Sequence, residues 1–109
     1  VGDALINAGF DVIESATNHV DDYGADFIEQ TLDFWNTKYP DVPVLGIHDS
    51  QEDADTVKTM EVNGIRIAFL NFVYGTNNGG PGEGKDYMID MIRKDKITTM
   101  IQPRKTATA

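Results

Sequence analysis

Apolar residues recur with helical spacing between residues 22 and 39, and this pattern predicts the longest helix of the chain. The stripe runs through Ile28, Leu32, Trp35 and Tyr39, at intervals of four, three and four, which places these side chains on one helix face. Aspartates crowd the expected first turns, where negative charge complements the helix dipole. Pro40 ends the pattern. The aromatic residues of the stripe are expected to pack in a core.

Shorter apolar runs predict a strand on each side of this helix. Residues 10–16 form a run with β-branched residues at its centre, and residues 42–47 form a second apolar run. Two strands joined through a helix pair in parallel when they lie in one sheet. The segment after each strand is therefore expected at the same edge of the sheet.

Two short helices are expected outside this unit. Residues 3–8 suit a helix with Asp3 as N-cap, and Gly9 can take the left-handed conformation that follows a helix end. Residues 51–55 suit a second short helix, with Ser50 or the aspartate before it as N-cap.

Residues 56–62 and 65–74 flank the dipeptide Asn63-Gly64, which predicts a β-hairpin with a type I′ turn. The second arm is almost continuously apolar, so we expect both faces of this strand to be covered.

The last third of the chain begins with a glycine-rich segment. Residues 75–84 contain five glycines and predict a loop. Residues 87–92 are expected to form a strand, and an apolar stripe beginning near Lys94 predicts a helix. Alternating helices and strands around a hairpin indicate an α/β or α+β domain, with a mixed sheet and flanking helices. A chain of 109 residues is expected to form one domain or part of one.

Composition narrows the possible partners. The formal net charge is −9, so the protein repels nucleic-acid backbones, and nucleic acid is not expected as a partner. The absence of cysteine excludes disulfides and thiolate metal sites from these residues. No apolar run reaches the roughly 20 residues needed to span a bilayer, so this segment is not expected to insert into a membrane.

Candidate chemistry lies directly after the first predicted strand, at residues 16–24. Asn18 offers a neutral oxygen to a divalent cation, and His19 can carry a proton near neutral pH. Asp22 can orient His19, although an aspartate at the head of a helix is also a common N-cap. A polar turn in which Asn18 and His19 bond only to backbone explains the same residues. His48 follows the second strand, yet beside a capping sequence it is expected to be a surface residue.

The order Asn18-His19, two residues, Asp22-Tyr23-Gly24 resembles the Asn-Asn-His-x-x-Asp-x-Gly signature of CapA/PgsA-type capsule synthesis proteins. That signature is a variant of the Gly-Asn-His-Asp block of calcineurin-like metallophosphoesterases. Thr17 stands where the family often has a first Asn. Further blocks agree in order and spacing, and these are residues 8–12, 46–50, 63–71 and 74–77.

The resemblance implies a fold and a set of roles. The fold would be part of a calcineurin-like layered sandwich, and residues 1–109 would be a partial domain truncated at both ends. Asn18 would be a metal ligand, and His19 and Asp22 would be catalytic. Thr76 and Asn77 are candidates for substrate binding, although Gly-Thr-Asn is also ordinary turn chemistry. The full-length protein would hold Mn, Zn or Fe ions, whose remaining ligands lie outside these residues.

Two functions follow from the resemblance. The first is a metal-dependent hydrolase in capsule or poly-γ-glutamate metabolism, acting on the capsule polymer or on a phosphoester. The second is a non-catalytic subunit that binds polymer or assembles with membrane capsule-synthesis proteins. Either would act at the extracellular face of a bacterial membrane. For the isolated chain we expect no turnover. A flavodoxin-like small-molecule module is disfavoured by the central hairpin.

Overall fold

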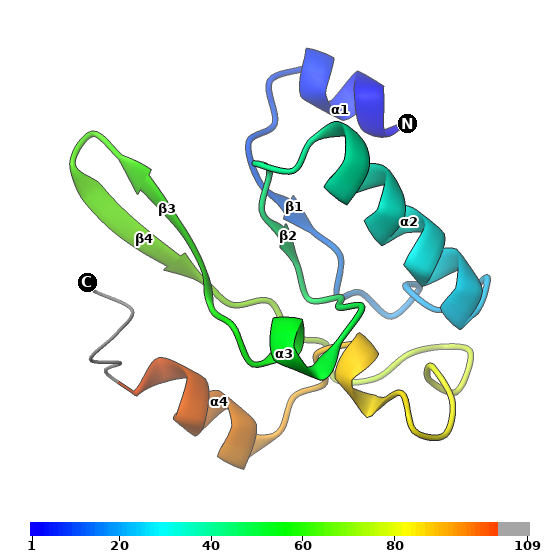
Figure 1. The fold of residues 1–109 in the computed structure, drawn as a ribbon. Coiled ribbons are helices and arrows are strands. Elements are labelled where there is room, and N and C mark those ends of the chain that lie inside the picture. Colours follow the sequence, from blue (N-terminus) through cyan, green and yellow to red (C-terminus); the bar gives the residue numbers. More distant parts are fainter. Residues whose placement is uncertain (103–109) are drawn as a thin grey trace.

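The computed structural model describes residues 1–102 and confirms the α/β class (Figure 1). Helices and short strands alternate along the chain up to the hairpin. In order, the elements are α1 (Gly2–Asn7), β1 (Ile13–Glu14), α2 (Ala25–Lys38), β2 (Val44–Leu45), α3 (Gln51–Ala54), β3 (Lys58–Val62), β4 (Ile65–Phe69), the 3-10 helix η1 (Asp86–Met88) and α4 (Lys94–Ile101).

The two strands around α2 pair in parallel, as the sequence predicts. Ile13 lies opposite Val44 and Glu14 opposite Leu45, so the segments that follow β1 and β2 leave at the same edge. Both strands are shorter than predicted, with two residues each. Helix α2 lies beside them (Figure 1) and buries Ile28, Leu32 and Trp35. The apolar stripe of this helix therefore forms one side of the core.

The predicted N-cap assignments at the first two helices are wrong. Helix α1 begins after Val1 without a side-chain cap, because the Asp3 carboxylate instead bonds to Lys38 Nζ at 2.8 Å and Tyr39 Oη at 2.5 Å. Helix α2 begins after Gly24, whose φ of 85° no ordinary residue adopts easily. Asp22 therefore lies in the turn before α2. Ser50 does cap α3, by accepting a bond from Asp53 N at 3.1 Å.

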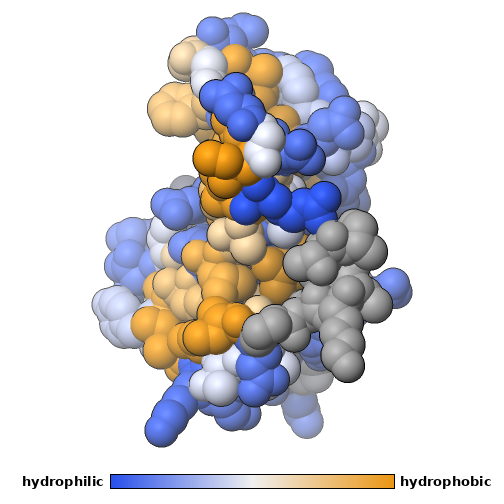
Figure 2. Space-filling model, turned by 90° about the vertical axis from the view of Figure 1, so that its left-hand side faces the viewer, coloured by the Kyte–Doolittle hydropathy of each residue, from blue (hydrophilic) through white to orange (hydrophobic). Residues whose placement is uncertain are grey.

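The hairpin β3–β4 is confirmed, with positive φ angles at Asn63 (52°) and Gly64 (82°). The prediction that both faces of β4 are covered is wrong. The register places Met60, Val62, Ile65, Ile67 and Phe69 on one face, and Ile65 there is 66% exposed. We call these five residues the apolar hairpin face. The hairpin projects from the rest of the molecule (Figure 1), and Figure 2 shows hydrophobic side chains gathered on that side.

Residues 87–92 do not form the predicted continuous strand. Asp86–Met88 is helical, and the residues after it pair only through isolated bridges, Ile47 with Ile89 and Val73 with Met91. The first bridge is antiparallel and the second parallel. Parallel and antiparallel pairing thus meet beside β2, as a mixed sheet requires, while the hairpin forms a separate two-stranded sheet.

The core lies between α2, the end of β2 and the segment after η1. Ile47, Met88 and Ile89 are each at most 2% exposed, and Trp35 is 5% exposed. Of the residues that the structure describes, none belongs to a helix with the length and apolar character needed to cross a membrane.

Candidate functional site

The candidate motif occupies a series of tight turns between β1 and α2. Its start is fixed by Asn71, whose Oδ1 accepts a hydrogen bond from Ala16 N at 2.8 Å. Gly46 lies against the same point, where a Cβ atom would come within 2.4 Å of Ala16 Cβ and 2.6 Å of Asn71 Oδ1. The close approach of β2 therefore requires glycine, and the motif starts from a rigid anchor.

Within the motif, His19 and Asp22 form a pair. His19 Nδ1 lies 2.9 Å from Asp22 Oδ2, and the side chains are 65% and 39% exposed. A proton on Nδ1 is donated to the carboxylate, which fixes the ring and leaves Nε2 as the nitrogen that can meet a substrate. Asp22 is thus bonded to His19 and is not the helix cap.

Thr76 and Asn77 lie against this motif, although more than 50 residues of sequence separate the two segments. Asn77 N donates to the backbone oxygen of Asn18 at 2.8 Å, and Asn77 Nδ2 lies 3.4 Å from His19 Nδ1. Thr76 Oγ1 donates to Asp21 Oδ2 at 2.7 Å. All five site residues named from the sequence therefore lie in one cluster. Their roles in catalysis, metal binding and substrate binding stay predictions.

Asp21 belongs to the same cluster and was missed as a site residue. The sequence suggests an exposed charge at a helix start, but the side chain is 0% exposed. Its Oδ2 accepts from Thr76 and from Gly80 N, at 2.7 and 2.6 Å, while its Oδ1 is buried without a hydrogen-bond partner. No local pattern marks such a residue, because its partners lie 55 and 59 positions away.

A metal site is not assembled by this part of the chain alone. Within residues 1–102 no group of three or more His, Asp or Glu side chains could hold an ion. Asn18 supplies one oxygen, and functional metal sites generally use several protein ligands. The donor set of the described residues therefore does not fit a metal by itself.

His48 is buried, so its prediction as a surface residue is wrong. It is 3% exposed because two carboxylates flank its ring, with Asp53 Oδ2 2.7 Å from Nδ1 and Asp90 Oδ2 2.9 Å from Nε2. Lys58 bonds Asp53 at 2.5 Å and Lys96 bonds Asp90 at 2.8 Å. We call these five residues the His48 charge chain. It joins β3, α3, the end of β2 and α4.

The two flanking carboxylates favour the protonated form of His48. Burial acts to lower the pKa of His48, but its hydrogen bonds to Asp90 and Asp53 outweigh burial and raise that pKa above its ordinary value. Burial acts to raise the pKa values of Asp53 and Asp90, and their bonds to His48 and to a lysine each lower these pKa values overall. When His48 is protonated, the charge chain alternates positive and negative groups.

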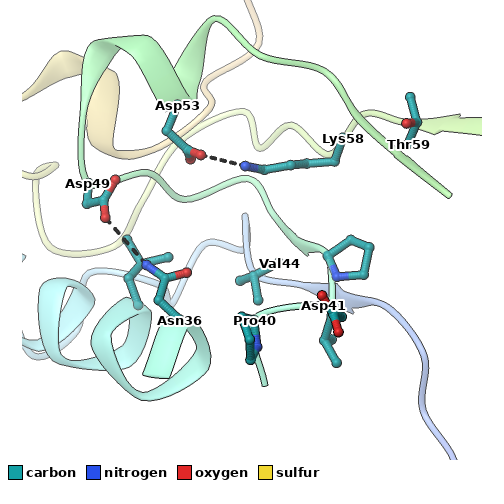
Figure 3. A pocket seen from close by; sticks show the side chains of 11 residues that line it. Asn36, Pro40, Asp41, Val44, Asp49, Asp53, Lys58 and Thr59 are labelled. Atoms are coloured by element: carbon teal, nitrogen blue, oxygen red, sulfur yellow. Dashed lines mark hydrogen bonds and ion pairs between the residues drawn. The ribbon is translucent and has the colours of Figure 1, made fainter. Parts of the chain in front are cut away.

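A polar pocket of about 230 Å³ lies beside this charge chain (Figure 3). It lies between α2, the segment before β2, α3 and the start of β3. The residues that line it include Asn36, Asp49, Asp53 and Lys58. Among these, Asn36 contacts Asp49 and Lys58 contacts Asp53. The pocket shares no residue with the motif, so the two features are separate.

Comparison with known proteins gives consistent results. A family model described as "Bacterial capsule synthesis protein PGA_cap" matches residues 1–108. The "Capsule biosynthesis protein CapA" of Bacillus anthracis is 35% identical over 69 residues, which cover 63% of this chain and 16% of that relative. The matched part therefore spans about a sixth of the relative's length. No solved structure matches the chain.

Proposed function

Because the chain belongs to the family of bacterial capsule synthesis proteins, we propose that it carries part of a metal-dependent hydrolase site that acts in capsule biosynthesis. The family predicted from the sequence motif is confirmed by the match over residues 1–108. The supporting observation for the site is the cluster at the carboxyl end of β1, where Asp22 and Asn77 each contact Nδ1 of His19, at 2.9 and 3.4 Å.

His19 is the proposed proton donor. Asp22 accepts from Nδ1, which holds the ring in place. Nε2 then gives its proton to the leaving oxygen of the substrate, and Thr76 and Asn77 supply a hydroxyl and an amide for contacts with the substrate. Asn18 contributes one metal ligand, and the proposal places the other ligands in parts of the full-length protein beyond this chain.

The proposed setting is the outer face of a bacterial membrane, and the proposed substrate is the capsule polymer or a phosphoester. Membrane capsule-synthesis proteins are the proposed partners. The net charge of −9 disfavours tight retention of an anionic polymer such as polyglutamate.

The test uses full-length protein loaded with Mn or Zn and compares wild type with Asn18→Ala, His19→Ala and the surface control Asn36→Ala. Turnover of a phosphodiester and of a γ-glutamyl polymer is measured. Loss of general-acid catalysis lowers kcat roughly 100-fold or more in His19→Ala, while Asn18→Ala weakens metal binding and Asn36→Ala changes neither. Equal turnover in all four proteins rules out the catalytic assignment.

Because the net charge of −9 suits export better than tight retention of an anionic polymer, a second candidate function is a non-catalytic polymer-binding or assembly subunit of a capsule synthesis or export complex. Capture of capsule-synthesis partners by the full-length protein, unchanged by Asn18→Ala and without turnover of either substrate, supports it. Loss of all capture in that variant contradicts it.

A further inference from the structure

Asp21 contacts the glycine-rich segment at three points. Its Oδ2 accepts from Thr76 Oγ1 at 2.7 Å and from Gly80 N at 2.6 Å, and its backbone oxygen accepts from Asn78 Nδ2 at 2.9 Å. One buried residue thus binds three residues of the segment 76–80. Bonds to an ionised carboxylate are stronger than bonds between neutral groups.

The backbone of the segment is shaped to meet this carboxylate. Gly79 and Gly80 have φ angles of 84° and 95°, which only glycine adopts readily. This turn brings the N–H of Gly80 back to Asp21. Between the two bonded positions, the segment presents Asn77 to the backbone oxygen of Asn18 and the ring of His19.

We propose that Asp21 is a positioning residue that fastens the segment 76–80 to the motif and thereby sets where Asn77 lies relative to the His19 ring. The functional consequence rests on the proposed function, since it gives His19 a role in proton transfer. The fastening itself does not rest on the proposed function, because it depends only on the hydrogen bonds that Asp21 makes to the segment 76–80. Neither the motif resemblance nor the family match assigns Asp21 a role, since it fills one of the two open positions between His19 and Asp22.

Because one side-chain oxygen of Asp21 has no hydrogen-bond partner, a substitution can replace that oxygen and keep the other. Asp21→Asn keeps one oxygen for Thr76 and Gly80, and it exchanges an unpartnered buried oxygen for an unpartnered amide. Asp21→Leu has a similar size and removes both acceptors. Thr76→Val removes the hydroxyl from the other side of the same bond. Asp33→Leu changes an exposed aspartate on α2 and serves as the matched control.

The test on the 109-residue chain combines amide hydrogen exchange at Asn77 and Gly80 with NMR shifts of the His19 ring. We expect exchange to accelerate by about tenfold or more in Asp21→Leu, less in Thr76→Val and least in Asp21→Asn, with His19 shifts moving in the same order. In Asp33→Leu neither readout changes.

If Asp21→Leu does not fold, Thr76→Val and Asp21→Asn still decide the question. Unchanged exchange and unchanged His19 shifts in Thr76→Val, and also in Asp21→Leu if that variant folds, overturn the proposal, as does an equal change in Asp33→Leu. Turnover by full-length protein is a separate arm. Altered exchange with unaltered kcat leaves the fastening role intact and contradicts its functional consequence, whereas absence of turnover by the wild type counts against the hydrolase proposal alone.

Discussion

The two histidines of this chain provide a controlled test of what burial contributes to stability. In each histidine, Nδ1 donates a hydrogen bond to an aspartate, at 2.9 Å for His19 and 2.7 Å for His48. The His19 side chain is 65% exposed and the His48 side chain is 3% exposed. His48 has a second aspartate, Asp90, whose side chain is 5% exposed. His48→Gln and His19→Gln therefore remove similar pairs from opposite environments.

The expected losses follow from this difference. Removing one partner of a buried ion pair typically costs about 3–5 kcal/mol, because the other charge is left buried. Lys96 still bonds Asp90 at 2.8 Å, so we expect the lower part of that range, about 3 kcal/mol, for His48→Gln. An exposed pair contributes about 0–1 kcal/mol. We expect His19→Gln to change the free energy of unfolding by less than about 0.5 kcal/mol.

Urea unfolding near pH 6 measures both losses, provided that the slope of the free energy against urea is unchanged. A double-mutant cycle of His48→Gln with Asp90→Asn isolates their interaction, and we expect a coupling above about 1 kcal/mol. Equal losses for the two histidine variants, or additive effects in the cycle, refute the view that the His48 charge chain stabilises the fold.

Four further predictions concern the pH dependence of stability, Gly46 and the apolar hairpin face. The pKa of His48 is raised in the folded protein. The stabilisation from protonated His48 is therefore complete below the unfolded pKa of about 6.5 and is lost as pH rises through the folded pKa. A pH series of urea unfolding measures this decline, and we expect His48→Gln to remove it. Asp53 and Asp90 have lowered pKa values, so their contribution is present above about 3.9 and is lost as pH falls through the folded values. Gly46→Ala places a Cβ 2.4 Å from Ala16 Cβ at a φ of 86°. We expect the free energy of unfolding to fall by about 2 kcal/mol or more. An unaltered urea midpoint contradicts the close approach at Gly46. Ile65→Thr lies on the exposed apolar hairpin face and should change the free energy of unfolding by less than about 0.5 kcal/mol; a loss above 1.5 kcal/mol shows that this face is covered.

The parts of the fold that the sequence predicts correctly depend on neighbouring residues. Asn63-Gly64 determines its turn through its own backbone preferences, and the stripe of α2 needs only its own spacing. The extent of strands 87–92 and 65–74 was misjudged because pairing and coverage depend on distant partners. An apolar run does not show whether anything lies over it, and the apolar hairpin face is exposed in the described residues.

The residues of the candidate site also differ in whether the sequence alone could reveal them. Asn18, His19 and Asp22 lie within one turn, so their motif is visible in sequence. Thr76 and Asn77 were candidates because they follow an apolar strand at a glycine-rich loop, and the structure brings them to the motif. Asp21 and the His48 charge chain were missed, because the bonds of the Asp21 side chain join residues 55 and 59 positions apart, and the bond between His48 and Asp90 joins residues 42 positions apart.

A crystal structure of the full-length protein loaded with Mn, with the ion located by anomalous scattering, would show whether Asn18 and His19 belong to a metal site. We expect an ion in direct contact with Asn18 Oδ1, further ligands from beyond this chain, and the ring of His19 facing the same cavity as Asn77. An ion bound elsewhere, or Asn18 and His19 turned away from it, contradicts the claim that this cluster is one corner of a metal-dependent site.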